Sequence, residues 1–136
     1  MILIEPQITL TGSGTMSTIA ANSAGAAISL QNVLADNLQT LVLLSGTSSI
    51  DVGSLGSSSY PIGAVSLTGD AIRLNGPVTA AGSNGSLSIS NSGDLHIESG
   101  DVALSGSFLQ QGIGDVFLGN NITADGGLFL FNLLYN

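Results

Sequence analysis

Three aspartates are the residues of this chain whose type and spacing could support chemistry. Asp70, Asp94 and Asp115 each follow a glycine and stand just before a short apolar segment. If those segments stack on one another, the three carboxylates come into line, and carboxylate and carbonyl oxygens are the ligands that Ca²⁺ prefers. The simpler interpretation is a set of solvated turns, because glycine accepts positive φ and aspartate caps nearby backbone amides. We predict the turns and keep a Ca²⁺ ladder as the alternative.

Catalytic groups are harder to find. His96 is the only histidine and Arg73 the only other basic residue, so a Ser-His-Asp triad can be drawn only because serine and aspartate are abundant. A polysaccharide lyase or hydrolase needs clustered carboxylates along a groove, often with basic residues that offset substrate charge. The one close group of acids, Asp94, Glu98 and Asp101, fits solvated surface. We therefore expect no enzyme activity, no catalytic residue and no bound cofactor.

The elements that would position these residues repeat along the sequence. Segments of the form apolar–any–apolar recur every 20 to 23 residues, with Gly, Asn, Asp and Ser between them. Such a steady period is typical of a chain that winds into a solenoid rather than folding into a globule. The segments are residues 8–10, 28–30, 50–52, 72–74, 95–97 and 116–118.

Two further sets of apolar residues return with nearly the same step. Three short strands per turn, with side chains that alternate between interior and solvent, predict a single-stranded, three-sided parallel β-solenoid. We expect an all-β fold, one domain over residues 1–136, and about six coils of roughly 20–23 residues. One further set comprises Ile19, Leu41 or Val42, Val65, Leu87, Phe108 and Leu128. The other comprises Val33, Leu55, Val78, Val102 and Ile122.

The winding also predicts which polar side chains become neighbours on the outer surface. Asp51, Arg73 and His96 occupy the middle position of successive apolar–any–apolar segments and should therefore point outward. Asp51 and Arg73 would be stacked as an exposed ion pair, which contributes only about 0–1 kcal/mol. We interpret these residues as surface groups with a structural role.

Composition excludes several classes of function. The chain has one Lys or Arg against nine Asp and Glu, a net charge of −8, and phosphate binding needs clustered basic residues, so we expect no nucleic-acid partner. The absence of cysteine excludes disulfides and thiolate chemistry. No apolar run approaches the ~20 residues of a spanning helix, so we expect no transmembrane segment. The start lacks the features of a signal peptide, and we expect a fragment of a longer precursor.

Both ends of the predicted solenoid carry apolar residues, where natural sheet edges are usually charged or capped. Alternation turns Phe117, Phe129 and Phe131 outward in the last part of the chain. These rings either fold over the open end as a cap or form a contact surface. We predict the contact surface, used for self-association or for continuation into further coils. Its residues are Ile2, Leu3, Ile4, Phe117, Phe129, Phe131, Leu133, Leu134 and Tyr135.

Three phrases of the chain resemble the repeats of filamentous-haemagglutinin-type proteins, which occur in very large secreted bacterial exoproteins and adhesins. They are ITLTG at 8–12, AVSLTGDAIRLNGPVT at 64–79 and GDLHI at 93–97. The resemblance implies a right-handed parallel β-helix, export as part of a long stalk, and an extracellular or cell-surface location. It also implies roles in attachment or matrix, with host or matrix glycans and proteins as partners. The family's amino-terminal secretion domain has no counterpart here, which favours an interior or carboxy-terminal segment.

These observations predict a non-catalytic structural segment of an extracellular adhesin-like exoprotein, acting as a stalk or scaffold. Two alternatives stay open. The first is a subunit of an extracellular filament formed by end-to-end stacking of solenoids. The second is a carbohydrate-binding or lyase-like β-helix module, which would show saturable glycan binding.

Overall fold

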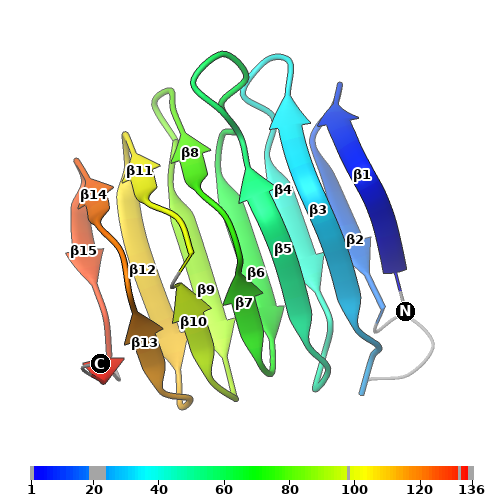
Figure 1. The fold of residues 1–136 in the computed structure, drawn as a ribbon, viewed down its shortest axis with the longest axis vertical. Coiled ribbons are helices and arrows are strands. Elements are labelled where there is room, and N and C mark those ends of the chain that lie inside the picture. Colours follow the sequence, from blue (N-terminus) through cyan, green and yellow to red (C-terminus); the bar gives the residue numbers. More distant parts are fainter. Residues whose placement is uncertain (1, 19–23, 98, 132, 135–136) are drawn as a thin grey trace.

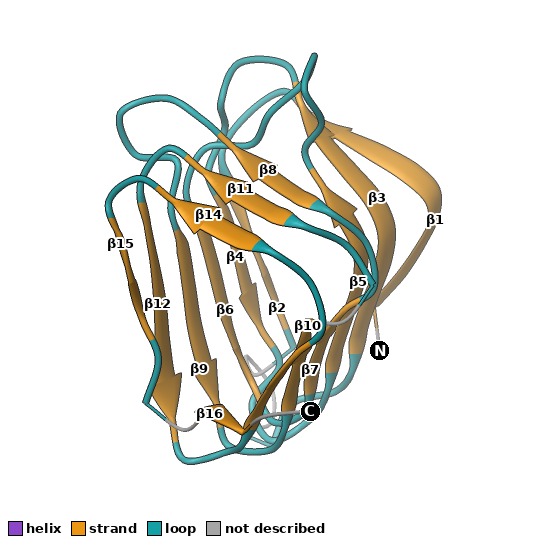
Figure 2. Ribbon diagram, turned by 60° about the vertical axis from the view of Figure 1, so that its left-hand side comes forward, coloured by secondary structure: helices purple, strands orange, loops and turns teal. Residues whose placement is uncertain are grey.

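The chain winds into a right-handed parallel β-solenoid. The computed structural model describes all residues except 1, 19–23, 98, 132 and 135–136, and at 3–6 and 133–134 it describes the backbone only. The described part contains strands and turns and no helix. In Figure 1 the chain climbs on the near side and descends on the far side as it advances from the N-terminus to the C-terminus, which is a right-handed winding. Figure 2 shows the three sides of each coil. The predicted fold class is confirmed.

Three long strands pass from the first side of the solenoid to the second without a break, so these two sides form one ten-stranded sheet. The first side contains β1 (Ile2–Leu10), β3 (Ile28–Ala35), β5 (Ile50–Leu55), β7 (Ile72–Leu74), β10 (Leu95–Ile97), β13 (Val116–Leu118) and β16 (Leu133–Leu134). The second side contains the ends of β1, β3 and β5, followed by β8 (Val78–Ala80), β11 (Val102–Leu104) and β14 (Ile122–Ala124).

The third side is a separate sheet of six strands, and its strands pair in parallel, as do those of the other two sides. Its strands are β2 (Gly14–Ser17), β4 (Leu41–Leu44), β6 (Val65–Gly69), β9 (Leu87–Asn91), β12 (Ser107–Gly112) and β15 (Gly127–Phe129). Each strand of a coil therefore lies directly on its counterpart one coil away, and the backbone hydrogen bonds run along the solenoid axis.

The core is a set of stacked aliphatic ladders. Ile50, Ile72 and Leu95 are register partners on successive coils of the first side, and all three are fully buried. Burial alternates along each strand, so inward residues pack and outward residues meet solvent. The ladder through Leu41, Val65, Leu87, Phe108 and Leu128 and the ladder through Val33, Leu55, Val78, Val102 and Ile122 are paired as predicted.

The first coil differs from the sequence prediction. Ile8 does not pair with Ile28; it pairs with Val33 on the second side, and Ile2 pairs with Ile28. The strand β1 rounds the corner in one piece, with a register shift between Ile4 and Gln7. The first step of this ladder is thus 26 residues, from 2 to 28, rather than 20. Ile19, which we had placed on the third side, lies outside the described residues, and Met16 pairs with Leu43 there.

The number of turns is slightly smaller than the six coils expected. The ladder of the second side has six rungs, so five turns of the chain separate its first rung from its last. These rungs are Ile8, Val33, Leu55, Val78, Val102 and Ile122.

Candidate functional site

The three aspartates do not all come into register, which the alternative of a Ca²⁺ ladder would require. The carbonyls of Asp94 and Asp115 accept the amides of Ile72 and Leu95, so these two aspartates are in register on successive coils. Asp70 precedes its strand by two residues instead of one, and its carbonyl accepts the amide of Gly93, which places it one position out of line. Within the described residues, no three His, Cys, Asp or Glu side chains come together as metal ligands do.

Asp70 behaves as a turn residue, which agrees with the simpler interpretation of its sequence. Its carboxylate oxygen Oδ1 accepts a hydrogen bond of 2.8 Å from the hydroxyl of Ser92 on the next coil. Ser92 begins the turn that leads into β10, so this bond ties together two corners of the solenoid.

The outer ladder of the first side brings Asp51, Arg73, His96 and Phe117 into register. The imidazole of His96 stacks on the ring of Phe117, with centroids 4.6 Å apart and planes inclined by 7°. The two rings face each other on the outer surface, so Phe117 points outward, as alternation along the strand predicts, and is half-buried. Asp51 and Arg73 are neighbours as expected, but the described part of the chain shows no ion pair between them.

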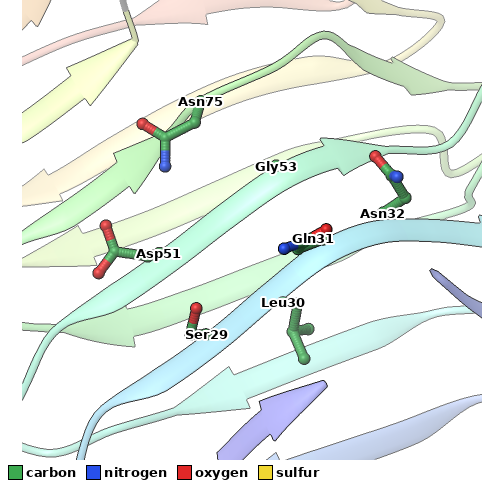
Figure 3. A pocket seen from close by; sticks show the side chains of 7 residues that line it. All are labelled: Ser29, Leu30, Gln31, Asn32, Asp51, Gly53 and Asn75. Atoms are coloured by element: carbon green, nitrogen blue, oxygen red, sulfur yellow. The ribbon is translucent and has the colours of Figure 1, made fainter. Parts of the chain in front are cut away.

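A shallow polar hollow lies beside this ladder, at the corner between the first and second sides. It has a volume of about 310 Å³ and opens to solvent. Figure 3 shows the side chains of Gln31, Asn32, Asp51 and Asn75 around the bare backbone of Gly53. These residues come from β3, β5 and the turn after β7, which lie on three successive coils. Ser29 and Leu30 complete the lining.

Gly53 forms the floor of the hollow because no other residue fits there. A Cβ atom at this position would lie 1.9 Å from the carbonyl oxygen of Gln31, far inside van der Waals contact. The strands are fixed on both sides of it, since Asp51 pairs with Ser29 on one neighbouring coil and with Arg73 on the other. The hollow is therefore a rigid feature of the backbone winding.

The polar groups around the hollow are largely available to a ligand. The side chains of Gln31, Asp51 and Asn75 make no hydrogen bond within the part of the chain that the structure describes. Asn32 is already engaged, because its Oδ1 accepts a 2.8 Å hydrogen bond from the hydroxyl of Ser54. Two amides and a carboxylate thus offer both donors and acceptors at one place. The sequence analysis did not find this site, although a glycine at an outward strand position was a readable signal.

A second polar group lies inside the solenoid and was also missed. Asn91 and Gln110 are buried on the third side, and the amide Nε2 of Gln110 donates to Oδ1 of Asn91 over 2.8 Å. Asn91 in turn donates to the carbonyl of Gly93, and Gln110 accepts the backbone amide of Phe131 over 2.9 Å. Every buried side-chain polar atom of the described residues has a partner. This network connects the last coil to the preceding two and is structural in nature.

The C-terminal end of the solenoid is apolar and open. Along one inward ladder Leu87 is 1% exposed and Phe108 is fully buried, but Leu128, the last rung, is 46% exposed. Phe129 and Phe131 are more exposed still, as predicted. Among the described residues, Leu128 is therefore an inward rung that remains largely uncovered.

Of the other residues of the predicted assembly surface, the structure describes the side chain of Ile2 alone. Ile2 is half-buried and packs against the core at the N-terminal end. The backbones of Leu3 and Ile4 belong to β1, and those of Leu133 and Leu134 belong to β16, which pairs with β13. Tyr135 and the side chains of these four residues lie outside the described part.

No known protein family, curated protein or solved structure matches this chain. The described residues contain no helix that could cross a lipid bilayer. The candidate sites therefore have to be interpreted from their own geometry.

Proposed function

We propose that the chain is a non-catalytic structural segment of an extracellular adhesin-like protein, in which the solenoid acts as a stalk or scaffold. One observation carries this proposal: an interior ladder of apolar side chains, from Leu41 to Phe108, whose last rung, Leu128, is exposed. A solenoid gains stability from each neighbouring coil, so an open apolar end favours attachment of a further coil. The resemblance to filamentous-haemagglutinin-type repeats supports the extracellular location.

A tandem fusion of two copies, joined by a short flexible linker, tests the stalk. If the open end accepts a further coil, β2 of the second copy covers Leu128 on β15, and interface energy is added to both copies. We expect the fusion to unfold in urea in one transition, at a higher midpoint than the single chain. Two independent transitions, or an unchanged midpoint, would contradict the proposal that this end is a docking layer for more solenoid.

The second candidate function is a filament subunit, favoured by the same exposed rung together with Phe131. Here the further layer is another copy of the chain, and association depends on protein concentration. Sedimentation velocity and negative-stain microscopy at low and high concentration should then show growing rods. Leu128→Asp should suppress the rods. Tyr60→Asp, which removes an exposed aromatic residue from the loop between β5 and β6, is the matched control and should leave them unchanged.

The two candidates are separated by these experiments. A chain that remains monomeric at high concentration, while its tandem fusion is stabilised, supports the stalk and excludes the filament. Rods that survive the Leu128→Asp substitution would show that association occurs through another surface.

A further inference from the structure

We propose that the hollow over Gly53 binds a neutral oligosaccharide through its hydroxyl groups. It goes beyond the structural role, because the hollow lies on the outer corner of the middle coils and not at the apolar end. The core and the ends of the solenoid would be the same whether or not the hollow binds a sugar. Failure of the one proposal therefore leaves the other standing.

The chemistry of the lining selects the ligand class. The amides of Gln31 and Asn75 each supply donors and an acceptor, and the carboxylate of Asp51 supplies acceptors. Adjacent sugar hydroxyls, which are donors and acceptors at once, match such a set. The lining offers an apolar ligand no exposed apolar side chain, since Leu30 is its only apolar member and is 2% exposed. An anionic ligand would meet Asp51 and a chain of net charge −8.

The geometry favours an extended ligand rather than a single small molecule. Gln31, Gly53 and Asn75 stand on three successive coils, and parallel strands lie about 4.8 Å apart. That spacing is close to the length of one pyranose ring, so neighbouring sugar units of a chain running along the solenoid axis meet neighbouring coils. The open, shallow form of the hollow permits a polymer to pass over it and predicts weak binding to any short piece.

The site is preorganised, which lowers the entropic cost of binding. Gln31 and Asp51 stand on β3 and β5, which are paired on both edges, and Asn75 directly follows β7. The hollow itself is enforced by the close approach of Gly53 to the carbonyl of Gln31. The hydrogen bond from Ser54 holds Asn32 at the rim. Only Gln31, Asp51 and Asn75 then have to be immobilised by the ligand.

The experiment is a titration of the ¹⁵N-labelled chain with two neutral tetrasaccharides, cellotetraose and N-acetylchitotetraose, followed by amide chemical shifts. We expect saturable shifts centred on the amides of Gln31, Gly53 and Asn75 with at least one of them. The double variant Gln31→Ala/Asn75→Ala loses two side-chain partners and should bind about tenfold more weakly or worse. Its matched control is Ser66→Ala/Ser88→Ala on the third side, where two outward serines are register partners.

Both substituted residues of the double variant are exposed, so its spectrum should remain that of the folded chain. Asp51→Asn is a second variant, which keeps the shape of the side chain and removes its charge, and it disturbs the fold less than the double variant does. No shift at the hollow with either tetrasaccharide, or equal affinity of the double variant and its control, would overturn the proposal. Tighter binding of a heparin tetrasaccharide than of both neutral ones would overturn the assignment to neutral sugars.

Discussion

Replacing Ile72 by alanine tests the central feature of the fold, the interior ladder. Ile72 is fully buried between Ile50 and Leu95, its register partners on the coils before and after. Removing such a side chain costs about 2–5 kcal/mol, and the larger values apply where the surroundings cannot collapse into the cavity. Both neighbouring backbones are held here by ladder hydrogen bonds, so we expect about 3–5 kcal/mol.

Two comparisons make the prediction specific. Ser88→Ala, on an outward position of β9, should change the free energy of unfolding by less than about 0.5 kcal/mol. Leu128→Ala should cost roughly half as much as Leu87→Ala, because Leu128 is 46% exposed and Leu87 is 1% exposed in the same ladder. Ile72→Asp should unfold the middle coils altogether, since it buries a carboxylate without a partner.

The assay is urea unfolding followed by far-ultraviolet circular dichroism, with the midpoint and the m-value fitted for each variant. Solenoids can lose cooperativity when one coil is weakened, so a split transition in Ile72→Ala would itself locate the damage in the middle. Equal midpoints for Ile72→Ala and Ser88→Ala would refute the assignment of inward and outward faces. Equal losses of unfolding free energy for Leu87→Ala and Leu128→Ala would refute the conclusion that the last rung is uncovered.

Two further substitutions test close contacts between coils. Gly114→Ala should lower the free energy of unfolding by about 2 kcal/mol or more, because its Cβ would lie 1.7 Å from the carbonyl oxygen of Gly93. Gly12→Ala is the control: no atom lies within 4 Å of its Cβ position, so the same urea melts should show almost no change. Gln110→Ala should cost about 1–3 kcal/mol, since it leaves Oδ1 of the buried Asn91 and the backbone amide of Phe131 without their partner. The backbone amide of Phe131 should then lose its protection against hydrogen exchange, and retained protection would argue against this bond.

The fold could be predicted because a parallel solenoid converts sequence period directly into spatial register. Ile50, Ile72 and Leu95 recur at steps of 22 and 23 residues, and the structure pairs them as the step requires. The register of the first coil could not be predicted in this way. Ile8 has the same local pattern as Ile28, and a period alone does not reveal that β1 passes a corner without a turn.

The polar sites were not predicted for a different reason. Their sequence signals can be recognised only when the position of each residue within its coil is known. Alternation along β9 makes Leu87, Ile89 and Asn91 inward, so a buried amide was implied once the strand bounds were known. The misalignment of Asp70 was visible in the sequence, because Asp70 lies two positions before the first residue of its strand, whereas Asp94 and Asp115 lie one position before theirs. The hollow needs three coils in register before Gln31 and Asn75 flank Gly53.

A physical connection exists between the structural role and the proposed binding site. The interior of the solenoid fixes each inward residue through its neighbours on two coils, while an outward residue such as Gln31 or Asn75 contributes little to stability. Recognition can therefore arise on the outer side at almost no cost to the fold. The exception is Gly53, whose close contact with the preceding coil forbids a side chain and leaves the hollow. The same winding that builds the rod thus also provides a depression that is lined by polar groups free to bind a ligand.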